Sequence, residues 1–252
     1  MPDVYQCRIA EKEKLSESLF EFAFVNESLA RESKPGQFLH IRCGEERLLR
    51  RPISISDVRG SELTFVVEAR GEGTGWLCGR TAGDALDIIG PLGRGFSIPE
   101  RDAIVVGGGV GVPPLLFAAK SVRGSVTAIL GFRDSHAMML LDEFEDVCDK
   151  VYVTTEDGGY GIQGLATGPL EMLLKEGGYS AVLTCGPHPM MSAVAMLCKK
   201  HAVPCQASME ERMACGVGAC LVCACATKTA VKEQMSRVCA DGPVFDAEEI
   251  VW

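Results

Sequence analysis

The chain has 252 residues, enough for two ordinary domains at about 150 residues per domain. Apolar residues make up 47% and charged residues 23% of it, which excludes a disordered, collagen-like or coiled-coil chain. The net charge of −9 argues against nucleic acid and anionic membranes as partners, since both present negative phosphates. The longest apolar stretch, 103–119, is broken by glycines and prolines and falls short of the ~20 residues of a membrane helix. We expect no membrane span.

Cysteine usage points to the compartment. The sequence holds 12 cysteines, a number that would suit a secreted disulfide protein. However, the segment 1–14 is rich in charge and has no apolar core of a secretion signal. We therefore expect a cytoplasmic chain, in which cysteines stay reduced or bind metal. Several of them crowd into 215–225, and this clustering favours a metal site.

The segment 1–98 has the pattern of short strands separated by turns. Phe20, Phe22 and Phe24 alternate with other residues as in a half-buried strand, and Pro35-Gly36 and Gly60 mark turns. The strands are expected over 5–9, 19–24, 37–42 and 63–68. A small antiparallel β-barrel or sandwich fits this segment.

The segment 99–205 alternates strands with helices, which predicts an α/β domain with a Rossmann-like parallel sheet. Strands are expected over 103–106, 126–130, 151–155 and 181–184, and helices over 115–121, 141–147 and 189–200. The remaining segment, 206–252, is too short to build an independent core, so we expect a bound metal to organise it. The predicted domains are therefore 1–98, 99–205 and 206–252.

The cysteine-rich segment carries the most specific pattern. Three cysteines are spaced C-x4-C-x2-C and a fourth follows after fifteen residues: Cys215, Cys220, Cys223 and Cys239. This is the plant-type [2Fe-2S] spacing, and Gly216 and Gly218 allow a tight loop whose N–H groups face the sulfurs. A zinc site of four thiolates is the alternative, although such sites more often use two C-x2-C pairs. Cys225 is either a packing residue near the site or a ligand in place of Cys223.

A glycine-rich loop follows the first expected strand of the α/β segment. Gly109, Gly111 and Pro114 form G-x-G-x-x-P, close to the Rossmann fingerprint, which has a third glycine. The glycines let a pyrophosphate approach the backbone, and the helix N-terminus favours the anion. This context favours nucleotide binding over a merely structural turn. No acidic residue ends the second strand, which is followed by 131–134. Because such a residue usually marks preference for NAD, the choice between NAD and NADP stays open.

A third pattern lies at a strand edge in the β segment, over 50–55. An arginine there can hold a pyrophosphate with forked hydrogen bonds, and the Ser54 hydroxyl can reach a ring nitrogen. Gly73 and Thr74 can add backbone and hydroxyl donors to the same phosphate, and 90–93 reads as a turn. Taken alone, the arginines would indicate only a charged strand entrance.

Taken together and in this order, the patterns resemble the ferredoxin-NADP reductase superfamily, and the tail resembles the electron-transfer subunits of class 1B dihydroorotate dehydrogenases. The resemblance rests on 51–54, 73–74, 109–114, 185–187, 213–223 and 237–245, and covers essentially the whole chain. It implies FAD in the β domain, NAD over the α/β domain and a [2Fe-2S] cluster in the tail.

The resemblance also carries over individual flavin contacts. The residues that it places at the FAD are Arg51, Pro52, Ile53, Ser54, Val66, Val67, Glu68, Gly73 and Thr74. The superfamily often has an aromatic residue near the flavin or adenine, whereas Ile53, Val66 and Val67 are aliphatic. This departure puts individual stacking contacts in doubt, though not flavin binding itself.

The function implied is an electron relay in pyrimidine (UMP) biosynthesis. A catalytic FMN subunit would oxidise dihydroorotate, and electrons would pass through the cluster and FAD to NAD+, in a heterotetramer with two copies of each subunit. No side-chain nucleophile or base is required, and the four histidines are scattered, although His188 and Cys185 could lie near the nicotinamide. The alternatives are a related NAD(P)H reductase that serves a hydrogenase or a ferredoxin-dependent complex, and a non-catalytic metal-binding module.

Overall fold

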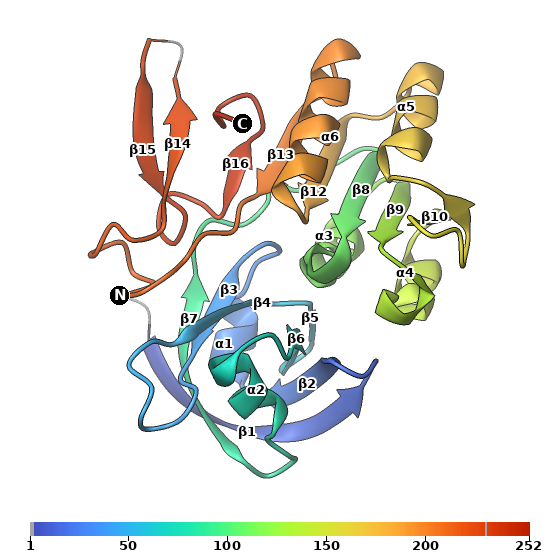
Figure 1. The fold of residues 1–252 in the computed structure, drawn as a ribbon. Coiled ribbons are helices and arrows are strands. Elements are labelled where there is room, and N and C mark those ends of the chain that lie inside the picture. Colours follow the sequence, from blue (N-terminus) through green and yellow to red (C-terminus); the bar gives the residue numbers. More distant parts are fainter. Residues whose placement is uncertain (1–2, 230) are drawn as a thin grey trace. The chain divides into compact units, whose positions relative to one another are not determined.

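The computed structural model describes residues 3–229 and 231–252 (Figure 1). The chain divides into two compact units. The first comprises the residues up to Gly95 with Glu210–Cys225 and Ser236–Pro243. The second comprises Phe96–Met209, Ala226–Met235 and Val244–Trp252. Beyond residue 209 the chain therefore contributes alternately to one unit and to the other.

The first unit is built on a seven-stranded antiparallel sheet in the order β4-β3-β7-β1-β2-β6-β5. Its strands are β1 (Asp3–Lys14), β2 (Leu19–Val25), β3 (Phe38–Ile41), β4 (Arg51–Ser54), β5 (Asp57–Arg59), β6 (Glu62–Glu68) and β7 (Ala85–Leu92). Two short helices, α1 (Glu27–Glu32) and α2 (Glu72–Cys78), accompany it. The edge strand β4 contacts β6 near the opposite edge, so the sheet curls into a half-barrel.

The half-barrel core explains the aromatic alternation of β2. Phe22 and Phe24 are fully buried, and both rings pack against Phe65 of β6, with centroids 5.3 and 6.0 Å away. Such aromatic pairs across neighbouring strands stabilise a sheet beyond the area they bury. The helix α1 begins where Asn26 accepts a hydrogen bond from the Leu29 N–H at 2.9 Å, a regular N-cap.

The second unit is a seven-stranded sheet in the order β11-β10-β9-β8-β12-β13-β16. Its strands are β8 (Ala103–Gly108), β9 (Val126–Phe132), β10 (Lys150–Thr155), β11 (Ile162–Gln163), β12 (Ala181–Cys185), β13 (Cys205–Ser208) and β16 (Val244–Asp246). All neighbours are parallel except β13 and β16. The central strand β8 is buried along its whole length, as expected where helices cover both faces.

Helices connect these parallel strands. They are α3 (Pro113–Ser121), α4 (Leu141–Val147), α5 (Thr167–Glu176) and α6 (His188–Lys200), with short 3-10 turns η1 (Gly109–Gly111) and η2 (Ser135–Ala137). The strands β14 (Ala224–Lys228) and β15 (Glu233–Arg237) form a two-stranded sheet of the tail. Among the described helices, none combines the length and the apolarity needed to cross a bilayer.

The predicted fold class is confirmed: a curled antiparallel sheet precedes a parallel α/β sheet (Figure 1). Sequence reasoning overlooked α1, α2, α5 and several strands. Its turn over 90–93 was wrong, because residues 90–92 pair in the ladders of β7 with β1 and β3. It also did not foresee that the tail supplies β16, which pairs antiparallel with β13 through residues 244–246. The division into the three domains 1–98, 99–205 and 206–252 stays a prediction; the two compact units share the residues after 206 between them.

Candidate redox site

The four predicted cluster cysteines come together as two pairs of thiols in the first unit. Cys215 lies within hydrogen-bonding reach of Cys220, and Cys223 lies within reach of Cys239. A two-iron cluster takes two thiolates on each iron, so this pairing suits it. The paired thiols therefore fit the predicted two-iron cluster.

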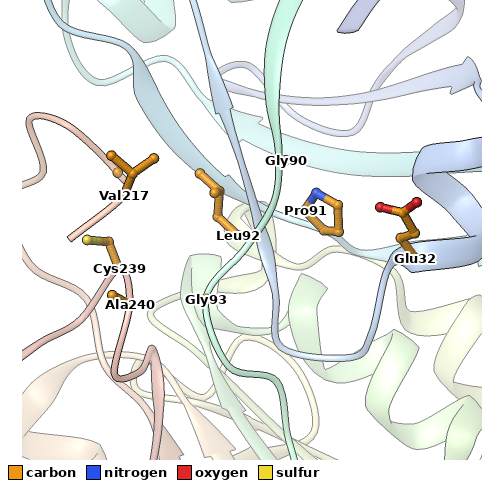
Figure 2. Close-up of a pocket in the computed structure, with 9 residues that line it drawn as sticks. Glu32, Gly90, Pro91, Leu92, Gly93, Val217, Cys239 and Ala240 are labelled. Carbon is orange, nitrogen blue, oxygen red and sulfur yellow. The ribbon is translucent and has the colours of Figure 1, made fainter. Parts of the chain in front are cut away.

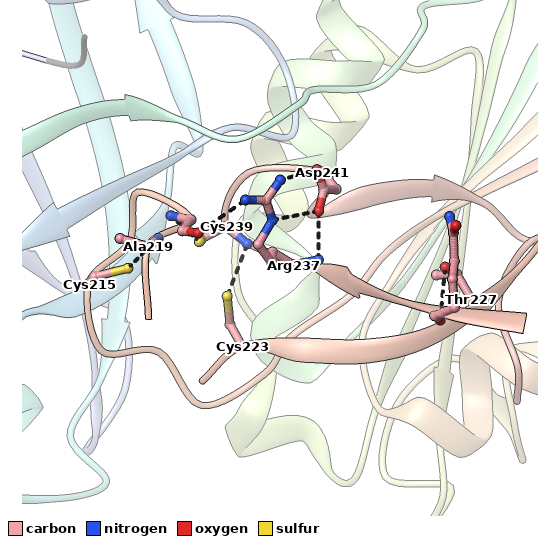
Figure 3. A network of polar contacts seen from close by, with 9 residues as sticks. Cys215, Ala219, Cys223, Thr227, Arg237, Cys239 and Asp241 are labelled. Atoms are coloured by element: carbon pink, nitrogen blue, oxygen red, sulfur yellow. Dashed lines mark hydrogen bonds and ion pairs between the residues drawn. The ribbon is translucent and has the colours of Figure 1, made fainter. Parts of the chain in front are cut away.

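Backbone amides surround these sulfurs (Figure 3). The Cys215 sulfur accepts from the N–H groups of Val217 and Ala219 at 3.4 and 3.3 Å. The Cys239 sulfur accepts from Gly218 at 3.1 Å, and the Cys223 sulfur accepts from the Cys239 N–H at 3.4 Å. Amide donors stabilise a thiolate and tune the reduction potential of an iron–sulfur centre. The residues present therefore fit a [2Fe-2S] cluster.

The same contacts shift the thiol pKa values. Burial acts to raise the pKa of Cys215, but the amide donors and Cys220 outweigh it and lower the pKa to about 6. Burial and the neighbouring Cys223 raise the pKa of Cys239 to about 12. Cys215 is thus prepared as a thiolate by its own loop, whereas Cys239 needs a positive ion beside it to ionise.

Two glycines give the cluster loop its turn. Gly216 and Gly218 have φ of +72° and +81°, a region that favours glycine. A β-carbon on Gly218 would lie 2.9 Å from that of Ala240. The predicted tight loop is observed.

An arginine supports the cluster loop from the other ligand segment (Figure 3). The Arg237 guanidinium donates to both carboxylate oxygens of Asp241 at 2.9 Å, and a third N–H donates to the Gly218 carbonyl at 3.1 Å. Forked arginine–carboxylate bonds fix a side chain in two directions. The ion pair also lowers the pKa of Asp241 to about 2. Sequence reasoning missed this support, although the i, i+4 spacing of Arg237 and Asp241 was a visible signal.

Cys225 is buried on β14, and burial raises the pKa of its thiol. Its sulfur takes no part in the two thiol pairs described above. This placement favours Cys225 as a packing residue and Cys223 as the ligand.

The structure separates the two neighbouring arginines of the flavin pattern. Arg50 is held by Asp87 through a 2.7 Å ion pair and donates to two backbone carbonyls. Arg51 Nη1 donates to the backbone carbonyls of Leu49 and Arg50. Within the described residues Arg51 makes no ion pair. Its Nε and Nη2 face Gly73 instead. Arg51 is therefore the arginine that can bind an anion such as a pyrophosphate.

Gly73 forms the other side of this cradle. A β-carbon there would lie 2.5 Å from Arg51 Nε and 2.8 Å from its Cζ, so only glycine leaves room for the guanidinium. The Thr74 hydroxyl accepts from the N–H groups of Arg70 and Gly71 at 3.0 and 3.2 Å. Thr74 thus orders the turn into α2. The Arg51 guanidinium, which has no ion-pair partner among the described residues, and the side-chain-free backbone at Gly73 together fit a dinucleotide phosphate.

The other residues expected at the flavin differ in burial. Ile53 of β4 and Val67 of β6 are buried in the half-barrel, whereas Pro52, Ser54 and Val66 are half-buried. Glu68 is half-buried too and forms an ion pair with Arg70. Their placement at the flavin stays a prediction.

In the second unit, the glycine-rich loop lies where ligands bind in doubly wound sheets. It follows β8, and the chain order reverses between β9 on one side of β8 and β12 on the other; the crevice at the carboxyl ends of such strands is a ligand site. A β-carbon on Gly111 would lie 2.5 Å from the carbonyl of Cys185 at the end of β12. Gly109 has φ of +52°, and Pro114 is buried in the first turn of α3.

The loop after β12 brings in two further groups. His188 opens α6, and its ring meets the Trp252 indole edge-on, with centroids 5.2 Å apart. The indole N–H donates to the Ala247 carbonyl at 2.9 Å. Sequence reasoning placed His188 and Cys185 near a nicotinamide. Cys185 ends β12 beside Gly111, and His188 opens the following helix α6; their placement at a nicotinamide stays a prediction.

A buried histidine lies beneath the cluster loop. His40 of β3 is fully buried, and a β-carbon on Gly216 would lie 2.5 Å from its Nδ1. Burial and the Arg50 charge lower the pKa of His40 to about 4, against the opposite effect of the Arg50 and Cys215 backbones. In the sequence His40 is one of four scattered histidines, and only the folded chain shows what it touches.

An open hollow of about 410 Å³ borders the same loop (Figure 2). It is lined by Glu32, Gly90, Pro91, Leu92, Gly93, Gly216, Val217, Cys239 and Ala240. One cluster cysteine, Cys239, therefore borders a hollow that is open to the outside.

The curled antiparallel sheet, the parallel α/β sheet and the cysteine loop together define an iron–sulfur reductase of the ferredoxin-NADP reductase class. A chain of an NADH-dependent reduced ferredoxin-NADP oxidoreductase superimposes with a TM-score of 0.88 and 31% identity, covering 98% of this chain and 90% of that one. A ferredoxin reductase of carbazole 1,9a-dioxygenase shares the fold, with a TM-score of 0.66 and 20% identity, over 81% of this chain and 67% of that one.

The sequence comparisons narrow this class. The family of the iron-sulfur cluster binding domain of dihydroorotate dehydrogenase B matches residues 210–251. The dihydroorotate dehydrogenase B (NAD(+)) electron transfer subunit of Caldanaerobacter subterraneus is 41% identical over 249 residues, 98% of either chain. That of Bacillus velezensis is 37% identical over 253 residues, 96% of either chain. The chain belongs to the family of dihydroorotate dehydrogenase B electron transfer subunits, as its resemblance in sequence implied.

Proposed function

We propose that the chain carries electrons from the flavin of a dihydroorotate-oxidising catalytic subunit, through a [2Fe-2S] cluster and FAD, to NAD+. One observation carries the proposal: four paired thiols, three of which accept backbone amide hydrogen bonds, and the Arg51–Gly73 cradle belong to one compact unit. The family to which the chain belongs supports the choice of donor and acceptor.

The chain's own groups bind and orient in this scheme. Cys215, Cys220, Cys223 and Cys239 hold the irons, and the loop amides stabilise the negative sulfurs. Arg51 neutralises a flavin pyrophosphate, while the glycine-rich loop before α3 receives the dinucleotide phosphate of NAD. The bound flavin supplies the exchange between single electrons and a two-electron hydride. Side-chain nucleophiles and bases have no part in the proposal.

The partner is expected to dock on the cluster loop. Val217, Leu221 and Val222 are apolar yet 47%, 65% and 52% exposed, and Cys220 is exposed among them. Clustered exposed apolar side chains mark interaction surfaces, and electron exchange with another subunit requires a cluster near the surface. We propose that this cluster-loop face, residues 217–222, contacts the catalytic FMN subunit in a heterotetramer with two copies of each chain.

The compartment is part of the same proposal. Within the described part of the chain the cysteines form no disulfide, and eight of the twelve are buried. Reduced thiols and an iron–sulfur site suit a reducing compartment, so we infer that the subunit works in the cytoplasm.

Anaerobic co-expression with the catalytic subunit tests the function. Dihydroorotate-dependent reduction of NAD+ should require both chains, and the purified chain should show flavin and [2Fe-2S] absorption bands. A colourless chain would contradict the proposal. The same bands with NADH oxidation but no dihydroorotate-linked activity would move the partner to another reductase system, such as a ferredoxin-dependent complex, which the NADH-dependent ferredoxin-NADP oxidoreductase structure favours as the second candidate.

A further inference from the structure

His40 lies between the two redox sites of the first unit. Its backbone pairs with Pro52 in the β3–β4 ladder, so it is the cross-strand neighbour of the segment expected at the flavin. Its side chain touches the opposite site, because a β-carbon on Gly216 would lie 2.5 Å from Nδ1 and 3.0 Å from Cε1. Gly216 directly follows the first cluster ligand, Cys215. His40 thus connects β4, the strand expected at the flavin, with the loop that carries the cluster cysteines.

The chemistry of this position does not suit simple packing. His40 has an exposed fraction of 0%, and neither ring nitrogen has a hydrogen-bond partner of regular geometry among the described residues. In any protonation state an imidazole carries at least one N–H, and leaving it unpaired inside a protein is costly. The other residues of β3 are apolar: Phe38, Leu39 and Ile41. An apolar side chain at position 40 would avoid that cost.

Backbone groups of the two sites interact with the ring without forming regular hydrogen bonds. The backbone of Arg50, next to the flavin strand, and the backbone of Cys215 both favour the protonated imidazole and so oppose the lowering of its pKa. The same Arg50 donates to the His40 carbonyl at 3.3 Å and is held by Asp87. The ring therefore sits on a fixed strand and reaches the backbone of a metal-binding loop, as outer-shell partners of metal ligands do.

We propose that His40 is a positioning residue that holds the segment Cys215–Gly216 against the flavin strand β4 and so sets the rate of electron transfer between flavin and cluster. The inference rests on the proposed function, because it assumes that both cofactors are bound. It assigns a role in the relay to a residue outside both sets of cofactor ligands.

The test compares His40→Leu, which keeps the volume without an N–H, with His40→Asn, which keeps an N–H close to the place of Nδ1. NADH is mixed with the full-length chain under anaerobic conditions, and flavin reduction and cluster reduction are followed separately. In His40→Leu the cluster step should slow by about tenfold, as outer-shell changes at metal sites typically do. Its electron paramagnetic resonance spectrum should also shift. The NADH-to-flavin step should keep its rate, and His40→Asn should restore most of the cluster step.

A matched control separates this role from general destabilisation. His201 also has a buried ring nitrogen without a partner among the described residues, but it belongs to the second unit. His201→Leu should leave the cluster step and the spectrum unchanged. If His40→Leu does not accumulate, His40→Phe offers a flat apolar ring in its place.

The outcomes are distinguishable from failure of the function itself. A wild-type chain that binds neither flavin nor cluster would contradict the proposed function before any variant is compared. If the wild type transfers electrons from NADH to its cluster, two results would overturn the role of His40. They are a His40→Leu variant with the wild-type rate and spectrum, and a His40→Asn variant as slow as His40→Leu.

Discussion

The proposed flavin cradle depends on the absence of a side chain at Gly73. Its missing side chain leaves room for Arg51 Nε, which a β-carbon would approach to 2.5 Å. We predict that Gly73→Ala displaces the guanidinium and weakens FAD binding roughly ten- to hundredfold, since a hydrogen bond to a charged group contributes about 1.5–3 kcal/mol. Because the displaced atoms are the end of a flexible side chain, the fold should persist. Fluorescence titration of the apoprotein with FAD measures the change.

The same short helix supplies the control. A β-carbon on Gly75 would meet nothing within 4 Å, and alanine favours a helix over glycine. Gly75→Ala should therefore bind FAD as the wild type does, with equal or higher thermal stability. Equal FAD affinity in Gly73→Ala and the wild type would show that Arg51 does not hold the flavin.

At the residue scale, the sequence predicted kinds of groups but not their partners. The cysteine spacing identified all four thiols that the fold brings together. By contrast, the neighbours Arg50 and Arg51 look alike in the sequence, and only the 2.7 Å ion pair of Arg50 with Asp87 shows which one is free. Asp87 lies 37 positions away, so no local pattern could reveal the pair.

The cluster loop depends on an element outside itself, the turn after β15. Arg237 donates to Gly218 and to both oxygens of Asp241. We predict that Arg237→Gln loses iron more readily, since changes to outer-shell partners cost roughly 10–100-fold in metal affinity. Iron and sulfide analysis after exposure to a chelator measures the loss. The control Arg133→Gln removes an arginine that is paired with Asp134 but 83% exposed; it should retain iron. Equal retention in both variants would rule out the support by Arg237.

At the element scale, regular periodicity decided what could be predicted. The strand expected over 126–130 corresponds to β9, whose residues are almost all buried. The helix expected over 141–147 corresponds to α4, which carries an apolar residue at every third position. The helix α2 escaped prediction since it is seven residues long and contains two glycines, which lower helix propensity. Its first turn nevertheless carries Gly73. The strand β16 escaped because three residues acquire their pairing only from β13, a contact between distant parts of the chain.

The whole molecule acts through a partner, and its apolar cluster-loop face should form the contact. We predict that Leu221→Asn weakens binding to the catalytic subunit about tenfold, since a central interface side chain often contributes about 1–2 kcal/mol. Leu221 has φ of +60°, and asparagine tolerates that conformation, so the loop should keep its shape. Calorimetric titration of one subunit with the other measures the affinity.

A second exposed apolar residue makes the control for this surface. Met196 on α6 is 64% exposed and belongs to the second unit. Met196→Asn should bind the catalytic subunit with the wild-type affinity. Unchanged binding in Leu221→Asn, or an equal loss in Met196→Asn, would move the docking face away from the cluster loop.

The alternation of the tail between the two units has a consequence for how the subunit is made. The half-barrel strands are translated before the parallel sheet, whereas the segments Glu210–Cys225 and Ser236–Pro243 that complete their unit are translated after most of that sheet. Domains otherwise tend to fold in the order of synthesis. Here the fourth thiol, Cys239, emerges only after the whole parallel sheet except β16 has been translated. The cluster site is therefore completed late in synthesis, when the half-barrel strands and most of the parallel sheet have already been made.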